Sequence, residues 1–283
     1  MVVHTVPPLV SLGFTALEAE IYAWLLEEAP VTGYRIAQAI GKPAPNVYKA
    51  IETLEAKGGV MVDEGRSRLC RPVPPEELLN HLERRFRVHR KDAEEHLARL
   101  HRPQTDDRVY TLRSADQVLE RARTMLGCVR EVVIVDAFPG MIETLRADLE
   151  AAAARGVAVG VIAYAPVDLA GVETVVSPRG ESVRARWSGD WVNVVIDGSE
   201  HLVALLGPAE TVRQAVWSGS VYLSWVYHSA LSSEFVLSEV ERVLEAGGSR
   251  AKLVARLDEL QRFKALEAPG YRVLKREIEG NPR

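Results

Sequence analysis

The sequence predicts an α+β protein of several domains, in which a winged helix-turn-helix and a long helix precede an α/β domain. Apolar residues recur at helical spacing three times before residue 60 and then alternate, which predicts three helices and a hairpin. From residue 109 onward, strand-like and helix-like segments follow one another, which is typical of an α/β layer. The chain of 283 residues has room for about two domains of ~100–200 residues each.

Capping residues and helix breakers mark the first two helices. Thr15 and Glu18 have the spacing of a capping box, and the apolar pattern that follows continues until Pro30 stops the helix. Thr32 is placed to cap a second, shorter helix that ends at Gly41. Because only a short turn separates it from the next helical pattern, we expect a helix-turn-helix.

A third helix and a hairpin complete the winged helix. Pro45 lies near the start of this helix, and Gly58-Gly59 follows its end. Its predicted apolar face consists of Val47, Tyr48, Ile51 and Leu54. Residues 60–62 and 69–73 then alternate on either side of a polar turn, which predicts the wing.

A long helix is predicted from Glu76 to about His101. One narrow apolar seam runs along it: Leu78, Leu82, Phe86, His89, Ala93, Leu97 and Leu100. The basic run Arg84–Lys91 is interleaved with acidic residues, so we interpret it as a solvated face. A long helix with so narrow a seam has little of its own domain to pack on, so we expect it to pair with a second copy.

The remaining pattern alternates between strands and helices. Strands are predicted at 109–112, 131–137 and 157–164, and helices at 116–126 and 141–155. From Val172 onward the pattern turns β-rich, through 183–187, 192–196 and 202–206, before a helix at about 220–246 and a last amphipathic stretch. Four parts result: a winged helix-turn-helix domain over 1–74, a long dimerisation helix and linker over 75–105, an α/β domain over 106–247 and a helical extension over 248–283.

Composition and charge exclude several classes of protein. The net charge of −4 argues against a protein that coats nucleic acid indiscriminately, yet seven basic and four acidic residues give 35–71 a local excess of positive charge. No apolar run approaches the ~20 residues of a membrane span and the N-terminus lacks a basic leader, so we expect a cytoplasmic protein. Cys70 and Cys128 lack partners at metal-ligand spacing, so we expect both in the core, and we expect no metal and no cofactor.

Four short motifs carry a resemblance to a known family. They are Leu12-Gly13-Phe14-Thr15, the stretch from Gly41-Lys42-Pro43 through Val47-Tyr48, Leu54-Glu55-Ala56-Lys57-Gly58, and Val73-Pro74-Pro75-Glu76-Glu77-Leu78-Leu79. With these motifs, residues 1–105 resemble the TrmB family of transcriptional regulators. Residues 106–247 resemble the middle domain of that family, which is similar to a single phospholipase D-type unit. The resemblance implies DNA binding by a homodimer and a phospholipase D-like regulatory domain.

The chain departs from the phospholipase D pattern at the positions of the catalytic residues. A catalytic unit has histidine, any residue, lysine, four more residues and aspartate. With Asp197 aligned to that aspartate, Asp190 stands in place of the histidine and Val192 in place of the lysine. These residues supply neither the nucleophile nor the positive charge that phosphodiester cleavage requires. We therefore expect that the protein is not an enzyme.

The predicted DNA-binding residues lie on the helix-turn-helix and the wing: Arg35, Pro45, Asn46, Tyr48, Lys49, Arg66 and Arg68. The third helix would enter the major groove with Pro45, Asn46 and Lys49 near base edges or phosphates, whereas Tyr48 faces either the core or the DNA backbone. Arg66 and Arg68 flank the wing tip, where positive charge reaches phosphate or the minor groove. The alternatives are a winged helix that serves protein contacts and a merely solvated turn.

Aromatic residues concentrate between residues 187 and 227. Either they form an ordinary core, or Asp190, Trp191, Trp217 and Trp225 line a pocket for a neutral or cationic effector. The sequence therefore predicts a sequence-specific transcriptional regulator, a homodimer that binds a double-stranded DNA operator and has a possible small-molecule effector. The alternatives are a divergent phosphodiesterase or other hydrolase, and an architectural DNA-binding protein without an effector.

Overall fold

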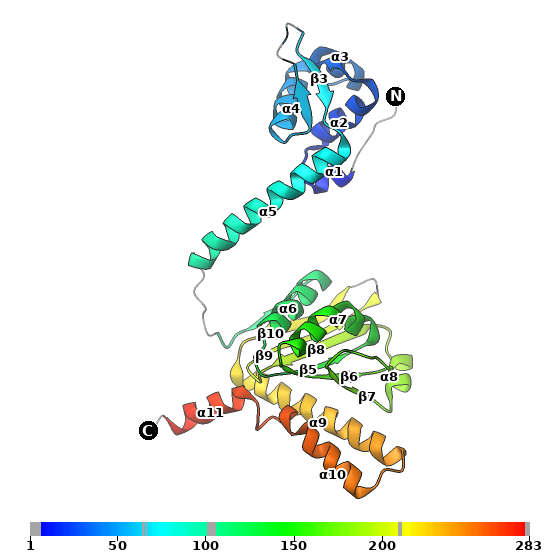
Figure 1. Ribbon diagram of the computed structural model, residues 1–283, viewed down its shortest axis with the longest axis vertical. Coiled ribbons are helices and arrows are strands. Elements are labelled where there is room, and N and C mark those ends of the chain that lie inside the picture. The colour runs from blue at the N-terminus through cyan, green and yellow to red at the C-terminus, as the bar shows by residue number, and fades with distance from the viewer. Residues whose placement is uncertain (1–6, 64, 66, 101–105, 209–210, 281–283) are drawn as a thin grey trace. The chain divides into compact units, whose positions relative to one another are not determined.

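The computed structural model describes residues 7–63, 65, 67–100, 106–208 and 211–280. The chain forms two compact units, residues 1–102 and residues 103–283. In Figure 1 the first unit is coloured blue to cyan and the second green to red. No helix within the described ranges combines the length and apolar character that crossing a membrane requires.

The first unit is a winged helix followed by a long helix, as the sequence predicts. Its helices are α1 (Pro7–Ser11), α2 (Ala16–Glu28), α3 (Gly33–Ile40), α4 (Ala44–Ala56) and α5 (Pro75–Leu100), and its strands are β1 (Val31–Thr32), β2 (Val60–Val62) and β3 (Leu69–Pro72). The capping box of Thr15 and Glu18 and the cap at Thr32 are both present, and Gly41 ends α3 with a φ of 65°. The sequence did not predict α1 or β1, and β1 adds a third strand to the hairpin in the order β1-β3-β2.

The start of α5 belongs to the core of the winged helix. Leu78 is fully buried there and Leu82 packs against the same core. The Tyr22 hydroxyl donates a hydrogen bond to the Val73 carbonyl at 2.8 Å, which ties α2 to the segment that leads into α5. The orientation of the first turns of α5 is therefore fixed by the winged helix.

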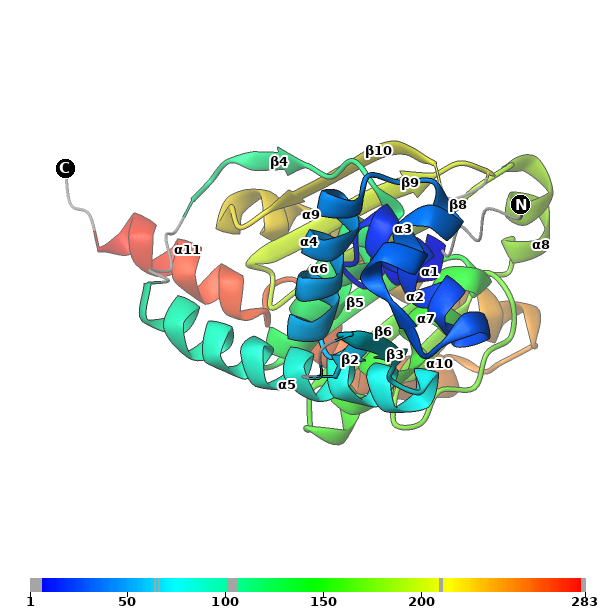
Figure 2. The same ribbon diagram turned by 90° about the horizontal axis from the view of Figure 1, so that it is seen from above.

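The second unit is a seven-stranded mixed sheet in the order β4-β10-β9-β8-β5-β6-β7. Its strands are β4 (Val109–Thr111), β5 (Val132–Ala137), β6 (Ala158–Ala163), β7 (Glu173–Val176), β8 (Asp190–Ile196), β9 (Glu200–Leu206) and β10 (Val212–Ser218). Strands β5, β6 and β7 are parallel, and the other neighbours are antiparallel. Figure 2 shows β4 beside β10 at one edge of the sheet.

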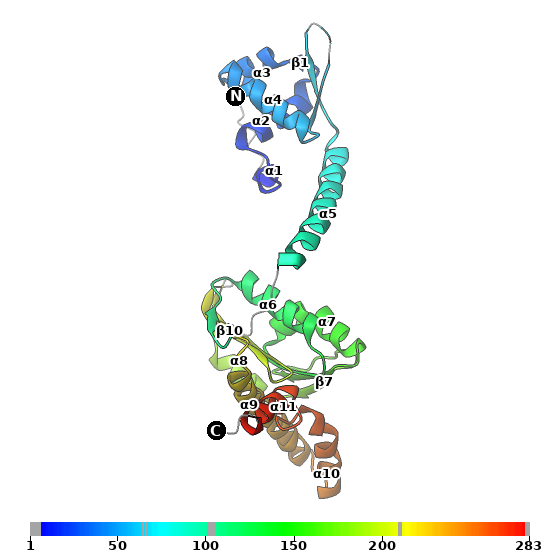
Figure 3. The same cartoon turned by 90° about the vertical axis from the view of Figure 1, so that its left-hand side faces the viewer.

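Helices cover both faces of this sheet (Figures 1 and 3). They are α6 (Ala115–Cys128) and α7 (Pro139–Ala154) on one face, and α9 (Val221–Glu245) with the 3₁₀ helix η2 (Leu260–Phe263) on the other. Three further helices are α8 (Gly180–Arg186), α10 (Arg250–Glu259) and α11 (Pro269–Glu279). A separate cluster of apolar side chains packs between the helices and each face of the sheet, so the sheet is buried on both sides.

The segment after α9 completes the core of the sheet unit. Leu260, Phe263 and Ala268 are buried against β5, β6 and α9. The ring nitrogen Nε2 of His228 donates to the Phe263 carbonyl at 2.9 Å, and burial lowers the pKa of this histidine. The Trp225 indole donates to the Ala265 carbonyl at 3.1 Å, so α9 holds the segment at two points.

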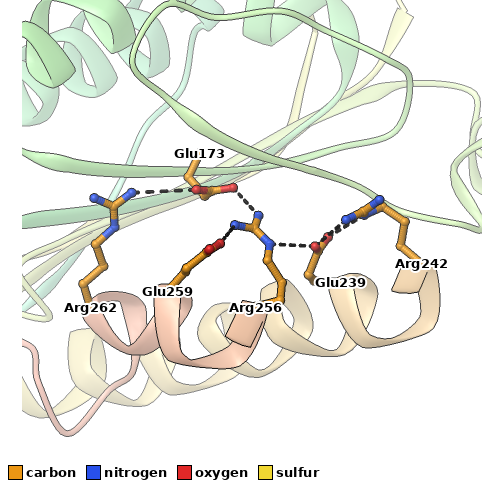
Figure 4. A network of polar contacts seen from close by, with 6 residues as sticks. All are labelled: Glu173, Glu239, Arg242, Arg256, Glu259 and Arg262. Atoms are coloured by element: carbon orange, nitrogen blue, oxygen red, sulfur yellow. Dashed lines mark hydrogen bonds and ion pairs between the residues drawn. The ribbon is translucent and has the colours of Figure 1, made fainter. Parts of the chain in front are cut away.

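A network of charges joins α9, α10, η2 and β7 (Figure 4). The Arg256 guanidinium contacts the carboxylates of Glu239 and Glu259, each at 2.7 Å, and that of Glu173. Arg242 contacts Glu239 at 2.6 Å, and Arg262 lies 3.8 Å from Glu173. The Glu239 side chain is 1% exposed, so this network neutralises a buried charge.

Two predictions in this unit are wrong. Residues 183–187, predicted as a strand, lie mostly in α8, because only Val183 packs against the apolar cluster and five alternating residues do not distinguish a strand from a helical turn. Cys128, predicted in the core, is exposed at the end of α6, whereas Cys70 is buried and its burial raises the pKa of its thiol. The sequence analysis also missed β10 and α11.

Candidate nucleic-acid interface

Helix α4 is fixed by its buried side and exposes the other. Val47, Ile51 and Leu54 are buried in the core of the winged helix. Pro45 in the first turn favours the start of α4, and the left-handed Gly41 lets α3 end sharply before it. In a helix-turn-helix, this second helix enters the major groove, so its exposed side is the candidate interface.

The predicted DNA-binding residues in the described ranges are all exposed: Arg35, Pro45, Asn46, Tyr48, Lys49 and Arg68. Arg66 lies outside the described residues. Among the described residues, the side chains of Arg35, Lys49 and Arg68 have neither an ion pair nor a hydrogen bond. A cation without an internal partner can pair with a phosphate without first losing another contact.

Tyr48 lies between α3 and α4 at the surface. Its side chain is 44% exposed, so the prediction that it belongs to the apolar face of the helix is wrong. A Cβ on Gly33 would lie only 2.6 Å from the Tyr48 Cε1 atom, so the glycine leaves room for the ring. The ring thus packs against Gly33 at the start of α3 and leaves the rest of its surface exposed.

The wing places Arg68 in an unusual backbone conformation. The amide of Asp63 donates to the Leu69 carbonyl at 2.8 Å and the amide of Arg68 to the Gly65 carbonyl at 3.1 Å, which closes the turn. Arg68 has a φ of 41°, in the left-handed region that non-glycine residues rarely occupy. An arginine held there at a cost in backbone energy is typical of a functional position.

Not every cation in the basic stretch faces solvent. The Lys57 ammonium contacts the Glu18 carboxylate at 2.7 Å and the Gly13 carbonyl at 2.8 Å. Burial alone would raise the pKa of Glu18, but hydrogen bonds from Lys57, Thr53 and Thr15 outweigh burial, and the pKa is lowered. Lys57 therefore stabilises the winged helix and is not part of the interface.

Three further exposed residues lie on α3 and the turn after it. Tyr34 is 59% exposed, and its hydroxyl accepts a hydrogen bond from the Gln38 amide at 3.3 Å. Lys42 is also exposed, immediately after the end of α3. The sequence analysis did not include Tyr34, Gln38 and Lys42 among the candidate interface residues, although all three are exposed near Arg35 in the sequence.

The seam of α5 changes character along the helix. Leu78 is buried, but Phe86 is 66% exposed, Leu97 62% and Leu100 76%. Hydrophobic side chains this exposed on one stripe of a charged helix indicate a surface that another helix can cover. His101, the predicted last residue, lies outside the described residues.

The predicted effector residues do not meet in one place. Trp191 packs against Phe138, with ring centroids 4.2 Å apart, and Trp225 stacks on Tyr271. Trp217 lies beside Tyr110 at 5.4 Å, next to the edge strand β4. Asp190 begins β8 and is half-buried.

A buried carboxylate lies near Trp191 that the sequence analysis missed. Asp136, on β5, accepts hydrogen bonds from the Trp191 indole at 3.1 Å and the Asn193 amide at 3.0 Å. Burial raises the pKa of Asp136, and burial together with this carboxylate raises that of Tyr164. Asp136 follows four consecutive apolar residues of a strand, and this position is the feature of the sequence that could have indicated a buried carboxylate.

Asp197 has a structural role in the sheet unit. Its carboxylate accepts hydrogen bonds from three successive backbone amides, those of Arg130 at 3.0 Å and of Glu131 and Val132 at 2.9 Å each. Val192 is fully buried in an apolar cluster. Across the described residues, no three His, Cys, Asp or Glu side chains are grouped so that they could hold a metal ion.

Comparison with models of protein families identifies the family of this chain. A family model described as sugar-specific transcriptional regulator TrmB matches residues 9–76, and one described as transcriptional regulator TrmB, EBD N-terminal subdomain, matches residues 108–233. Together the two matches span more than half of the chain. The chain belongs to the TrmB family of transcriptional regulators. It is thus a regulator that binds DNA, and the exposed side of α4 belongs to its matched winged-helix region.

Individual proteins resemble the chain more distantly. An uncharacterized protein of Bacillus subtilis strain 168, YrhO, is 24% identical over 231 residues, which are 81% of this chain and 84% of YrhO. The structure of TrmBL2, described as an archaeal chromatin protein with a novel mode of DNA binding, is 19% identical, covers 78% of this chain and 92% of its own, and has a TM-score of 0.35. NucT from Helicobacter pylori is 10% identical, covers 46% and 95%, and also has a TM-score of 0.35.

Proposed function

We propose that the protein is a sequence-specific regulator that binds its operator as a homodimer. Helix α4 enters the major groove with Asn46 and Lys49 toward base edges or phosphates, and Arg68 and Arg66 contact the backbone or the minor groove. The observation that carries this proposal is a set of exposed cations on α3, α4 and the wing that have no internal partner among the described residues, within a chain whose net charge is −4. A local positive charge of this kind lets one surface of the protein bind DNA, whereas the net negative charge disfavours indiscriminate binding along the DNA.

The DNA contacts are tested by a double variant with a matched control. Operator fragments are first selected from genomic DNA by the purified protein. We expect Lys49→Ala with Arg68→Ala to lower affinity roughly fifty-fold near 0.1 M salt and to reduce the salt slope by about two, since each phosphate contact contributes about 0.9.

The control variant is Arg87→Ala with Arg90→Ala. It removes the same charge from α5, where both arginines already pair with Glu83 and Glu94 at 2.5 and 2.8 Å. Its affinity and salt slope are expected to change little. Equal effects of the two double variants would contradict the assignment of the interface.

Dimerisation through α5 is the second part of the proposal. Phe86 and Leu97 lie on the exposed seam, whereas Val88, which is 59% exposed, lies on the opposite side of the helix. Phe86→Asp with Leu97→Asp is expected to give monomers in sedimentation and to weaken operator binding, and Val88→Asp is the control. A monomer in the unmutated protein would refute this part.

Effector sensing without catalysis completes the proposal. The position of the catalytic histidine is taken by Asp190 and that of the lysine by the buried Val192, so neither nucleophile nor phosphate-binding charge is supplied there. The sheet unit would then respond to a small molecule and change the operator affinity of the winged helix. Turnover of a phosphodiester substrate by the purified protein would refute the non-enzymatic assignment.

A further inference from the structure

A cavity of about 580 Å³ opens between β4, α6 and β10. Its lining includes Tyr110, Leu112, Gln117, Arg121, Thr124 and Trp217. The volume lies in the range of small-molecule sites, ~300–1,000 Å³. One wall is aromatic, because the rings of Tyr110 and Trp217 lie 5.4 Å apart at an interplanar angle of 32°.

Arg121 is the cation of this cavity. Its guanidinium carbon lies 4.2 Å from the centre of the Trp217 ring, so the flat group is stacked on the indole. Within the described ranges it has no ion pair and no hydrogen bond. Stacking restricts the guanidinium and leaves its N–H groups in its own plane free, which is the arrangement that binds a carboxylate with two parallel hydrogen bonds.

The other polar groups in the cavity favour an anion. The Glu120 carboxylate is occupied by Arg123 at 2.7 Å, and the Trp217 indole N–H by Glu200 at 2.6 Å. The Gln117 carbonyl oxygen already accepts from the Arg113 amide at 2.8 Å, which leaves its NH₂ group as a second free donor. Among the described residues, the free nitrogen groups of the cavity, the Arg121 guanidinium and the Gln117 NH₂ group, are therefore donors, and one of them carries a positive charge.

We infer that this cavity binds a small organic carboxylate carried on a flat apolar body. Arg121 and the Gln117 NH₂ group hold the carboxylate, and Tyr110, Leu112 and Trp217 cover the flat body. This rests on the effector-sensing part of the proposed function and reverses the charge of the guest expected from Asp190. The Tyr110 hydroxyl donates to Asp106, which lies just ahead of β4, so a guest against this ring contacts the chain at the entry to the sheet unit.

The test uses three probes of one shape and different charge on the full-length protein. They are 4-fluorobenzoate, 4-fluorobenzamide and 4-fluorobenzylamine, observed by fluorine NMR line broadening. We expect the carboxylate to bind with a Kd of about 1 mM, as is usual for a fragment, and the neutral and cationic probes to bind at least tenfold more weakly. Equal binding of the three probes, or no binding of the carboxylate, would overturn the inference.

Variants locate the probe. Arg121→Gln is expected to weaken the binding of 4-fluorobenzoate at least tenfold. Arg121→Lys is expected to lose less affinity, because lysine keeps the positive charge but lacks the two parallel N–H donors of the guanidinium. The matched control is Arg184→Gln, which removes an exposed arginine from α8, in the connection from β7 to β8 and so away from the β4 edge. Unchanged binding in Arg121→Gln overturns the site, and displacement by phenyl phosphate more strongly than by benzoate overturns the choice of carboxylate.

Operator binding separates this inference from the proposed function. If 4-fluorobenzoate binds through Arg121 but leaves operator affinity unchanged, the site stands and the proposed effector sensing fails. If the protein retains no operator at all, the DNA contacts fail while the NMR result still decides the site. A change in operator affinity that disappears in Arg121→Gln supports both.

Discussion

The surface of the winged helix and the charge network of the sheet unit use the same residue type in opposite ways. On the winged helix, Arg35 and Arg68 are exposed and, in the part of the chain that the structure describes, have no ionic partner. On the sheet unit, Arg256 contacts three carboxylates and is 20% exposed. The paired arginine stabilises the fold, whereas the unpaired ones remain available to a ligand. By the same criterion, Arg121 of the sheet unit, which has no ionic partner among the described residues, is available to a ligand.

The comparison predicts that loss of the paired arginine costs the most stability. Arg256→Met would leave Glu239, which is 1% exposed, with Arg242 as its one remaining ionic partner among the described residues. We expect the free energy of unfolding of the sheet unit to fall by about 3 kcal/mol, the low end for a broken buried pair. Urea unfolding followed by tryptophan fluorescence measures this, since four of the five tryptophans belong to that unit.

The matched control is an arginine of the same network. Arg262 is 54% exposed and lies 3.8 Å from Glu173, so Arg262→Gln is expected to change stability by less than about 0.5 kcal/mol. Similar losses in both variants would show that pairing does not distinguish structural arginines. Neither variant is expected to change the salt slope of operator binding.

Asp197 extends the comparison to an anion. Its carboxylate is held by three backbone amides, and its side chain connects the start of β5 to the turn after β8. Asp197→Asn removes the charge and turns an NH₂ group toward donors, so we expect a loss of about 2.5 kcal/mol in the same unfolding experiment. Stability close to that of the unmutated protein would show that these hydrogen bonds contribute little.

Lys57 is the paired cation of the winged helix and tests the comparison within one unit. Lys57→Met leaves the buried Glu18 without its cation, and because Lys57 is 31% exposed we expect a loss of about 2 kcal/mol. Hydrogen exchange of the α2 and α4 amides measures it. Lys49→Met, which removes an exposed and unpaired cation from α4, is the control and is expected to leave this protection unchanged.

The pH dependence of the same variant follows from Glu18. The folded-state pKa of Glu18 is lowered, so its stabilisation is fully present above the unfolded pKa and is lost as the pH falls through the folded pKa. In Lys57→Met the largest influence left is burial, which raises this pKa, so the loss of stability on acidification is expected to become smaller. An unchanged acid profile would show that Lys57 does not set the pKa of Glu18.

Local chemistry explains why the winged helix could be predicted and parts of the sheet unit could not. Thr15, Thr32 and Gly41 act on residues close to them in sequence, so their caps can be predicted from the sequence alone. The contacts of Trp217 depend on α6 and β4, which lie about 100 residues earlier in the chain. The aromatic residues were therefore recognised, but not the cavity to which Trp217 belongs.

Arg68 gives the smallest expected effect and the sharpest contrast with the paired arginines. Its φ of 41° costs about 1–2 kcal/mol in a residue with a side chain, while glycine adopts it freely but loses about 0.5–1 kcal/mol through unfolded-state entropy. Arg68→Gly is therefore expected to raise the free energy of unfolding by about 0.5 kcal/mol and to weaken operator binding several-fold. Arg68→Lys keeps the charge and the strained backbone, so it is expected to retain most of the affinity without gaining stability. If Arg68→Gly is less stable than the unmutated protein, Arg68 stabilises the fold of the wing. If it binds the operator as tightly as the unmutated protein does, Arg68 makes no contact with DNA that contributes to affinity.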